Sequence, residues 1–325
     1  MKAVLCKQWG PPTALVIEDS PPPVAGPGEV VVAVKAAGVN FPDLLIIDNK
    51  YQFKPELPFT PGGEFAGTVV AVGDGVRRCK PGDQVVAFST WGAFAEQAKV
   101  PETAVMPIVP GMDYAVAAGF LITYGTAYYA LHDRGALQPG ETLVVLGAAG
   151  GVGLAAVEIG KALGARVIAC ASSSEKLATC RAHGADETVN YADENLRDRL
   201  KVLCGKSGAD VVLDPVGGGY SEAALRALGW KGRHLVVGFA AGDIPRMPLN
   251  LILVKGCAVL GVAWGEFAAR EPSAFAEGLE ALGRLFQAGK LRPHIFARYP
   301  LERVADAMQE LATRRVQGKV ILELG

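Results

Sequence analysis

The segment 147–153, which reads GAAGGVG, has the residue types and spacing of a turn that holds a diphosphate. An apolar run leads into it, an amphipathic helix pattern follows as far as Gly164, and a second apolar run begins directly afterwards. Small residues allow a tight turn, so that backbone N–H groups at the start of the helix can approach a pyrophosphate. A glycine-rich turn can also be purely structural. In this strand–turn–helix–strand order it predicts a dinucleotide site, with Ala148 in the place of the first glycine.

The end of the second apolar run predicts which dinucleotide is bound. An NAD site has an acidic side chain here, which bonds to the ribose 2′-hydroxyl and repels the extra phosphate of NADP. In this chain Ser172, Ser173 and Ser174 stand at that place, followed by Glu175 and Lys176. Hydroxyls and a positive charge suit a dianionic phosphate, whereas Glu175 suits the first turn of a helix. The pattern favours NADPH, although the same serines can serve as helix caps.

The other reactive side chains lack the spacing that metal sites and nucleophilic catalysis require. The six cysteines are scattered, and no serine or cysteine stands in a nucleophile-elbow sequence. We therefore expect reduced, mostly buried thiols and no metal site. Structural or surface roles are expected for the four histidines, His132, His183, His234 and His294.

The elements that must position the glycine-rich turn follow two patterns. As far as about residue 115, short β-type runs are broken by Pro and Gly, which predicts an antiparallel barrel-like or sandwich-like region. These runs lie at 29–35, 65–73, 84–88 and 93–100. From 141 to about 260, apolar runs alternate with helix-length segments such as 151–163 and 194–204. This alternation predicts a parallel, doubly wound sheet.

The last part of the chain contains a helix pattern at 273–288, a second helix from about 301 and a strand at 319–324. Two helices and one strand are few for an independent core, so we expect this tail to pack on the N-terminal region.

Composition limits the classes of partner. The chain has 325 residues, of which 32 are basic and 33 acidic, and no run of either sign. This balance argues against nucleic acid and anionic lipid as partners and favours a small molecule. The first ten residues lack the apolar stretch of a signal peptide or membrane span, and we expect a cytoplasmic protein.

With the glycine-rich turn in place, the chain resembles the quinone reductase and zeta-crystallin branch of the medium-chain dehydrogenase/reductases over essentially its whole length. The matching motifs are AAGVNFPD (36–43), LPFTPGGEFAGTVVAVG (57–73), PGDQVVAF (81–88), YGTAYYAL (124–131), GAAGGVG (147–153), DETVNY (186–191), DVVLDPVGG (210–218) and QGKVILEL (317–324). The resemblance implies an α/β fold with a GroES-like, β-rich catalytic domain from both chain ends, and an inserted Rossmann domain with a doubly wound parallel sheet. We place these parts at 1–118, 119–260 and 261–325.

The resemblance also implies a homodimer and a nicotinamide-holding cleft where the domains meet. Zinc-dependent members would have a cysteine at the position of Asn40 and a histidine at that of Gly63. Only Asp43 and Glu64 keep the zinc pattern here, and 121–123 supplies no third thiolate. Zinc needs three or four such ligands, so we expect a metal-free mechanism.

The candidate site residues rest on the same resemblance. Asn40 and Tyr51 are the candidate catalytic residues, with Asn40 beside the nicotinamide and acceptor and Tyr51 near the cleft mouth as a hydrogen-bond donor. The candidate cofactor contacts are Asn40, Thr126, Gly150, Gly151, Val152, Ser172, Ser173, Lys176, Tyr191 and Phe239. Asn40 could instead form the turn after Gly38, and Tyr191 could be a packing residue after a strand.

The predicted function is a zinc-independent NADPH:quinone oxidoreductase acting on quinones or related conjugated carbonyls. An enone or 2-enoyl-thioester reductase of the same fold is one alternative, and a non-catalytic NADPH-binding crystallin or sensor is another. Two positions depart from the family pattern. Glu158 stands where the quinone reductase signature has glutamine, and the segment 46–55 lacks the aromatic and arginine pairing of zeta-crystallin.

Overall fold

The computed structural model describes residues 1–325, which form two compact units. The first unit contains Met1–Ile122 and Pro293–Gly325, and the second contains Thr123–Arg292. The expected boundary at 260 is therefore wrong, because residues 261–292 belong to the second unit. The expected boundary after 118 lies four residues too early, since the first unit continues to Ile122.

Aromatic packing explains why residues 261–292 stay with the second unit. The Phe267 ring stacks on Tyr129 with centroids 4.1 Å apart, and it also contacts Phe275. Trp264 lies so close to Gly125 that a Cβ there would be 2.7 Å from the indole nitrogen. These contacts join residues far apart in the sequence, so a reading of local patterns cannot assign the segment to either unit.

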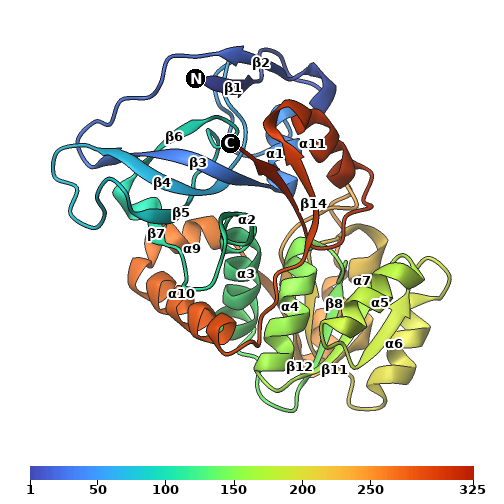
Figure 1. Cartoon of the computed structure of the whole chain (residues 1–325). Coiled ribbons are helices and arrows are strands. Elements are labelled where there is room, and N and C mark those ends of the chain that lie inside the picture. Colours follow the sequence, from blue (N-terminus) through green and yellow to red (C-terminus); the bar gives the residue numbers. More distant parts are fainter. The chain divides into compact units, whose positions relative to one another are not determined.

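The first unit is built on a seven-stranded sheet in the order β14-β15-β3-β4-β5-β7, with β6 paired to β3 (Figure 1). All its pairs are antiparallel except β14 with β15, so the C-terminal strand joins the sheet of the N-terminal segment. The strands are β3 (Glu29–Val39), β4 (Glu64–Val72), β5 (Gln84–Phe88), β6 (Gln97–Pro101), β7 (Val105–Pro107), β14 (Ile295–Pro300) and β15 (Lys319–Glu323).

Short elements complete this unit. They are the hairpin β1 (Lys2–Leu5) and β2 (Val16–Asp19), the helices α1 (Phe41–Ile47), α2 (Tyr114–Ala118) and α11 (Val304–Ala312), and the 3-10 turns η1 (Pro12–Ala14), η2 (Glu102–Ala104) and η4 (Leu301–Arg303). The core includes Phe65 and Phe94 and continues to Met308 on α11. Close backbone approach is required at Gly38, where a Cβ would lie 2.1 Å from the Ala118 carbonyl oxygen.

The second unit is built on a six-stranded sheet in the order β10-β9-β8-β11-β12-β13, and every pair in it is parallel. The strands are β8 (Thr142–Leu146), β9 (Arg166–Ala171), β10 (Glu187–Asn190), β11 (Ala209–Asp214), β12 (Leu228–Val236) and β13 (Ala258–Gly261). The chain runs outward from β8 to β10 and then returns to start β11 on the other side of β8. Ligands of open parallel sheets bind beside the carboxyl ends of the strands at such a reversal.

Helices cover both faces of this sheet (Figure 1). On one face α4 packs closely, since a Cβ on Gly160 would touch Leu143 and Val167. On the other face Leu200 and Leu225 join a core with Val144 and Ile168. The helices are α3 (Leu121–Tyr128), the π-helical η3 (Tyr129–Arg134), α4 (Gly151–Ala162), α5 (Ser174–Ala182), α6 (Leu196–Cys204), α7 (Gly218–Ala227), α8 (Leu249–Lys255), α9 (Trp264–Arg270) and α10 (Pro272–Gln287). No helix of the chain is long and apolar enough to cross a membrane.

Candidate functional site

The glycine-rich turn joins β8 to α4 at the carboxyl edge of the second unit's sheet. Gly147 has φ +56°, a conformation that favours glycine, and Gly150 is the N-cap of α4. Gly153 is required for close packing, because a Cβ there would lie 2.3 Å from the Gly147 carbonyl oxygen. The first turn of α4 thus presents free N–H groups and the positive end of the helix dipole, which suits an anion.

A group of polar side chains follows the carboxyl ends of β9 and β10. Lys176 Nζ donates to Ser172 Oγ at 3.3 Å, and Ser173 is the N-cap of α5, accepting from the Lys176 backbone N–H at 3.3 Å. The two serines therefore differ in their contacts: Ser173 caps the helix, and Ser172 pairs with Lys176. The Tyr191 N–H donates to the Ala171 carbonyl oxygen at 3.1 Å, which fixes Tyr191 beside this group. The Tyr191 ring lies 4.6 Å from that of Tyr220.

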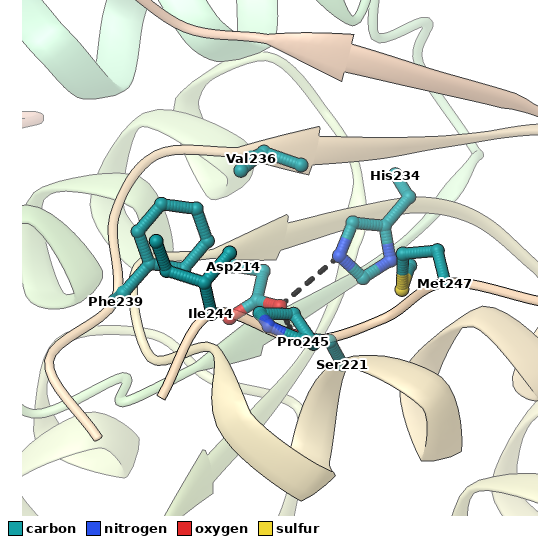
Figure 2. A pocket seen from close by; sticks show the side chains of 8 residues that line it. All are labelled: Asp214, Ser221, His234, Val236, Phe239, Ile244, Pro245 and Met247. Atoms are coloured by element: carbon teal, nitrogen blue, oxygen red, sulfur yellow. Dashed lines mark hydrogen bonds and ion pairs between the residues drawn. The ribbon is translucent and has the colours of Figure 1, made fainter. Parts of the chain in front are cut away.

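Phe239 lines a pocket of about 190 Å³ beyond the ends of β11 and β12 (Figure 2). In Figure 2 Phe239 and Ile244 lie on one side of this pocket, and His234 and Met247 lie on the other. Phe239 also packs on Gly217, where a Cβ would be 2.9 Å from its ring. The walls are mostly apolar, and the polar side chains that line the pocket, Asp214, Ser221 and His234, are hydrogen-bonded to one another.

Asp214 organises the turn beneath this pocket. Its carboxylate accepts the Val216 and Gly217 N–H groups at 2.9 and 2.8 Å, the Ser221 hydroxyl at 2.5 Å and His234 Nε2 at 3.1 Å. Burial alone would raise the pKa of Asp214, but these hydrogen bonds outweigh it and hold the pKa below its usual value. Both carboxylate oxygens of Asp214 are therefore engaged within the protein, and buried His234 holds one of them through Nε2.

The first unit contains a buried polar cluster around Asn40, the residue that precedes α1. Asn40 Nδ2 donates to the Gly38 carbonyl oxygen at 3.1 Å and to Glu64 Oε2 at 3.0 Å. Asn40 Oδ1 accepts from Lys319 Nζ at 2.6 Å, and the same ammonium lies 3.2 Å from Glu64 Oε2. Both amide N–H groups of Asn40 are thus engaged within the protein.

Asp43 completes this cluster by accepting the Asn40 backbone N–H at 2.7 Å. Burial raises the pKa of Asp43 to about 7, although the Asn40 hydrogen bond and the Lys319 charge act in the opposite direction. Tyr51 packs against the first unit's core, and burial and the charge of Asp43 raise the pKa of its hydroxyl. The cluster therefore contains one buried ammonium and two buried carboxyl groups with different environments.

The candidate residues fall into two groups by unit. Gly150, Gly151, Val152, Ser172, Ser173, Lys176, Tyr191 and Phe239 all follow the carboxyl ends of strands of the second unit. Thr126 belongs to the same unit and is buried on α3. Asn40 and Tyr51 belong to the first unit.

Sequence reasoning missed Lys319, whose ammonium joins Asn40 to Glu64. The available signal was a charged residue at the start of the apolar strand 319–324, which is unusual for a strand that becomes buried. It also missed the partners of Glu158, which accepts from Tyr124, His183 and Arg292. No local pattern indicates those contacts.

Comparison with known proteins gives the family. The family model described as "Alcohol dehydrogenase GroES-like domain" matches residues 26–111, and the one described as "Zinc-binding dehydrogenase" matches 151–283. The chain is 40% identical to "Quinone oxidoreductase-like protein 2 homolog" of Nematostella vectensis, covering 99% of this chain and 88% of that protein. It is 39% identical to "Quinone oxidoreductase-like protein 2" of Mus musculus, covering 99% and 92%.

Among solved structures, the Escherichia coli quinone oxidoreductase complexed with NADPH superposes with a TM-score of 0.94 at 29% identity and full coverage of both chains. The fold and site thus define an oxidoreductase with a GroES-like domain and a Rossmann-type parallel sheet, which confirms the expected fold class. The chain belongs to the quinone oxidoreductase family of the medium-chain dehydrogenase/reductase superfamily. The segment 151–283 matched by the zinc-binding model contains none of the Asn40 cluster. The chain has no group of three or more His, Cys, Asp or Glu that could hold a metal ion.

Proposed function

We propose that this protein is an NADPH-dependent reductase of quinones and related conjugated carbonyls that works without zinc. The observation that carries the choice of cofactor is the Lys176–Ser172 pair at the end of β9, beside the N-terminus of α4. A lysine and hydroxyls in that place suit a 2′-phosphate, and the related Escherichia coli enzyme is complexed with NADPH.

The second unit would hold the cofactor along the carboxyl edge of its sheet. Gly150, Gly151 and Val152 would contact the pyrophosphate at the helix N-terminus. The donors would be the N–H groups of Gly151 and Val152, because the Gly150 N–H donates to the Gly147 carbonyl oxygen at 3.0 Å. Ser172, Ser173, Lys176 and Tyr191 would surround the 2′-phosphate, while Thr126 and Phe239 would lie at the nicotinamide end. Bound NADPH supplies the hydride, and the protein supplies binding and orientation.

The side chains that already fill the Asn40 cluster support a mechanism without zinc. One carboxylate, Glu64, faces the Lys319 ammonium, and the other, Asp43, holds the Asn40 backbone N–H. Asn40 supplies an amide, which is a poor zinc ligand, and Gly63 supplies no side chain. A metal would have to displace Lys319 and would still lack cysteine and histidine ligands.

Tyr51 is the better candidate for contact with the acceptor. The raised pKa of its hydroxyl keeps it protonated at neutral pH, so it can donate a hydrogen bond to a carbonyl oxygen that gains negative charge. Asn40 cannot donate without releasing Gly38 or Glu64, and it therefore positions Glu64 and Lys319. Without a Lewis acid, acceptors that take hydride readily are favoured.

We also propose that the protein forms a homodimer through the exposed edge of the second unit. Strand β13 pairs only with β12, so its other edge is open. Large apolar side chains are exposed on α8 and around it, at Trp230, Ile244, Leu249, Leu253 and Val254. Trp230 packs against the end of α8, where a Cβ on Gly256 would lie 2.7 Å from its ring. Such a patch beside an open strand edge fits a second copy of the chain.

The first test is oxidation of NADPH and NADH by chelator-treated protein with quinone, enone and 2-enoyl-thioester acceptors. We expect turnover of quinones with NADPH preferred. Lys176→Ala should raise the KM for NADPH by roughly 10- to 100-fold, the equivalent of a charged hydrogen bond, and leave NADH kinetics unchanged. Lys201→Ala, an exposed lysine on α6, is the matched control. Turnover of enones alone would support the alternative reductase, and binding without any turnover would support a non-catalytic role.

A further inference from the structure

Glu158 is a buried carboxylate in the middle of α4 that the proposed reaction does not use. It is 3% exposed. Its Oε2 accepts the Tyr124 hydroxyl at 2.7 Å and the Arg292 backbone N–H at 3.0 Å, and its Oε1 lies 2.6 Å from His183 Nδ1. A buried carboxylate is retained at a cost unless it is hydrogen-bonded, and here it is fully bonded.

The partners of Glu158 lie at two particular places in the chain. The chain passes between the units twice, after Ile122 and after Arg292. Tyr124 is the second residue of the second unit, and Arg292 is its last. One carboxylate therefore binds both connecting segments, which we define as 120–124 and 290–294, to the same helix.

The other contacts of Glu158 extend to α5. His183 is the C-cap of α5, and the Arg292 guanidinium donates to the Ala182 carbonyl oxygen at that helix end at 2.9 Å. At their opposite ends, α4 and α5 have Gly150 and Ser173 as N-caps, which are proposed contacts of the pyrophosphate and the 2′-phosphate. Glu158 thus joins both cofactor-holding helices to both connecting segments.

We propose that Glu158 is a positioning residue, through which cofactor binding at the start of α4 and α5 orders the two connecting segments. The proposal rests on the proposed function for the identity of the cofactor. Because helices are stiff, ordering at the first turns of α4 and α5 restrains Glu158 and His183, and their hydrogen bonds pass that restraint to Tyr124 and Arg292. Burial and the charge of Glu158 raise the pKa of Tyr124 well above its usual value, so this hydroxyl remains a donor.

The chemistry of the cluster provides a matched pair of variants. In Glu158→Gln the amide oxygen can still accept from Tyr124 and Arg292, and the amide nitrogen can donate to neutral His183. In Glu158→Leu none of these bonds remains. The glutamine variant should therefore behave as the wild type, and the leucine variant should lose the anchor. Tyr124→Phe removes only the hydrogen bond from the first connecting segment to Glu158. This variant tests the anchor if the leucine variant does not fold.

The test is amide hydrogen exchange with and without NADPH, together with steady-state kinetics. Without cofactor, Glu158→Leu should speed exchange at both connecting segments by roughly tenfold or more and leave the central strands β8 and β11 unchanged. Tyr124→Phe should speed exchange in 120–124 only. With NADPH, wild type and Glu158→Gln should become protected at 147–153 and at both segments, whereas Glu158→Leu should be protected at 147–153 alone. Its kcat should fall while its KM for NADPH stays close to that of the wild type.

Unchanged exchange at the segments in Glu158→Leu, or a uniform increase over the whole second unit, would overturn the proposal. Equal NADPH protection of the segments in the leucine and glutamine variants would do the same. If NADPH fails to protect 147–153 in the wild type, the proposed function fails, and the comparison without cofactor still decides whether Glu158 anchors the segments.

Discussion

At the scale of single residues, Lys319 is the one on which the first unit's polar cluster depends. A buried ammonium is costly to desolvate, and here the cost is offset by contacts with Glu64, Asn40 and the Val39 carbonyl oxygen. The ammonium supplies the positive charge that this buried site needs. The Asn40 amide is held between Lys319 and Glu64, so its oxygen and nitrogen are both used in hydrogen bonds within the protein.

Asp43 in the same cluster makes stability depend on pH. Its pKa is raised by burial to about 7, whereas in the unfolded chain an aspartate titrates near ~3.9. The folded state therefore holds the proton more tightly, and the stability linked to Asp43 is present below about pH 4 and lost as the pH rises through about 7. Between about pH 5 and 7 the free energy of unfolding of the wild type should fall by roughly 2–3 kcal/mol relative to Asp43→Asn.

Urea unfolding at several pH values measures this difference. The exposed Asp19 on β2 provides a control, because Asp19→Asn should keep the pH dependence of the wild type. Identical slopes for wild type and Asp43→Asn would show that Asp43 is ionised in the folded protein at acidic pH.

At the scale of elements, the turn between β8 and α4 is where we propose that the pyrophosphate of the cofactor binds. Gly153 lets α4 start directly over the turn, and the turn directs the first N–H groups of the helix outward. Strands β9 and β10, which α5 connects, are parallel neighbours, so Ser172 and Tyr191 follow their carboxyl ends at the same edge of the sheet. Each step depends on local geometry, and for this reason a run of neighbouring residues is enough to predict this part of the proposed site.

Gly153→Ala tests the turn. The new methyl group would meet the Gly147 oxygen and the Ala148 backbone, so the turn must shift. We expect a loss of roughly 1–3 kcal/mol in stability and at least a tenfold rise in the Kd for NADPH. Gly219→Ala on α7, where a Cβ would meet nothing within 4 Å, should leave both quantities close to wild type. Fluorescence titration with NADPH and thermal unfolding measure the two effects, and tight binding by Gly153→Ala would contradict this account of the turn.

At the scale of the whole molecule, the apolar patch around α8 is the main unexplained surface. Leu253 is 82% exposed. Several large apolar side chains exposed together are unusual on the surface of a monomer. Leu253→Asp should place a charge in the proposed dimer interface and give monomers, whereas Val24→Asp, at an equally exposed apolar site of the first unit, should leave dimers intact. Light scattering after size-exclusion chromatography measures the mass, and a monomeric wild type at micromolar concentration would refute the dimer.

The local elements of both units were largely predictable. The strand 84–88 matches β5, and the helix 151–163 differs from α4 by one residue at its end. Both follow from short patterns of apolar residues and glycine that do not depend on distant parts of the chain. The strand expected at 93–100 is β6 at Gln97–Pro101, because the preceding residues run toward the hairpin, where Ala95 bridges Ala3.

The sequence by itself determined the family, the glycine-rich turn and the serine–lysine group, because each is a run of neighbouring residues. Only the tertiary structure decided the rest. Lys319 meets Glu64 across 255 positions, and Arg292 meets Glu158 across 134. The same is true of 261–292, which aromatic contacts with α3 and η3 assign to the second unit. Contacts of this kind form only when the folded core brings distant segments together, so no local pattern records them.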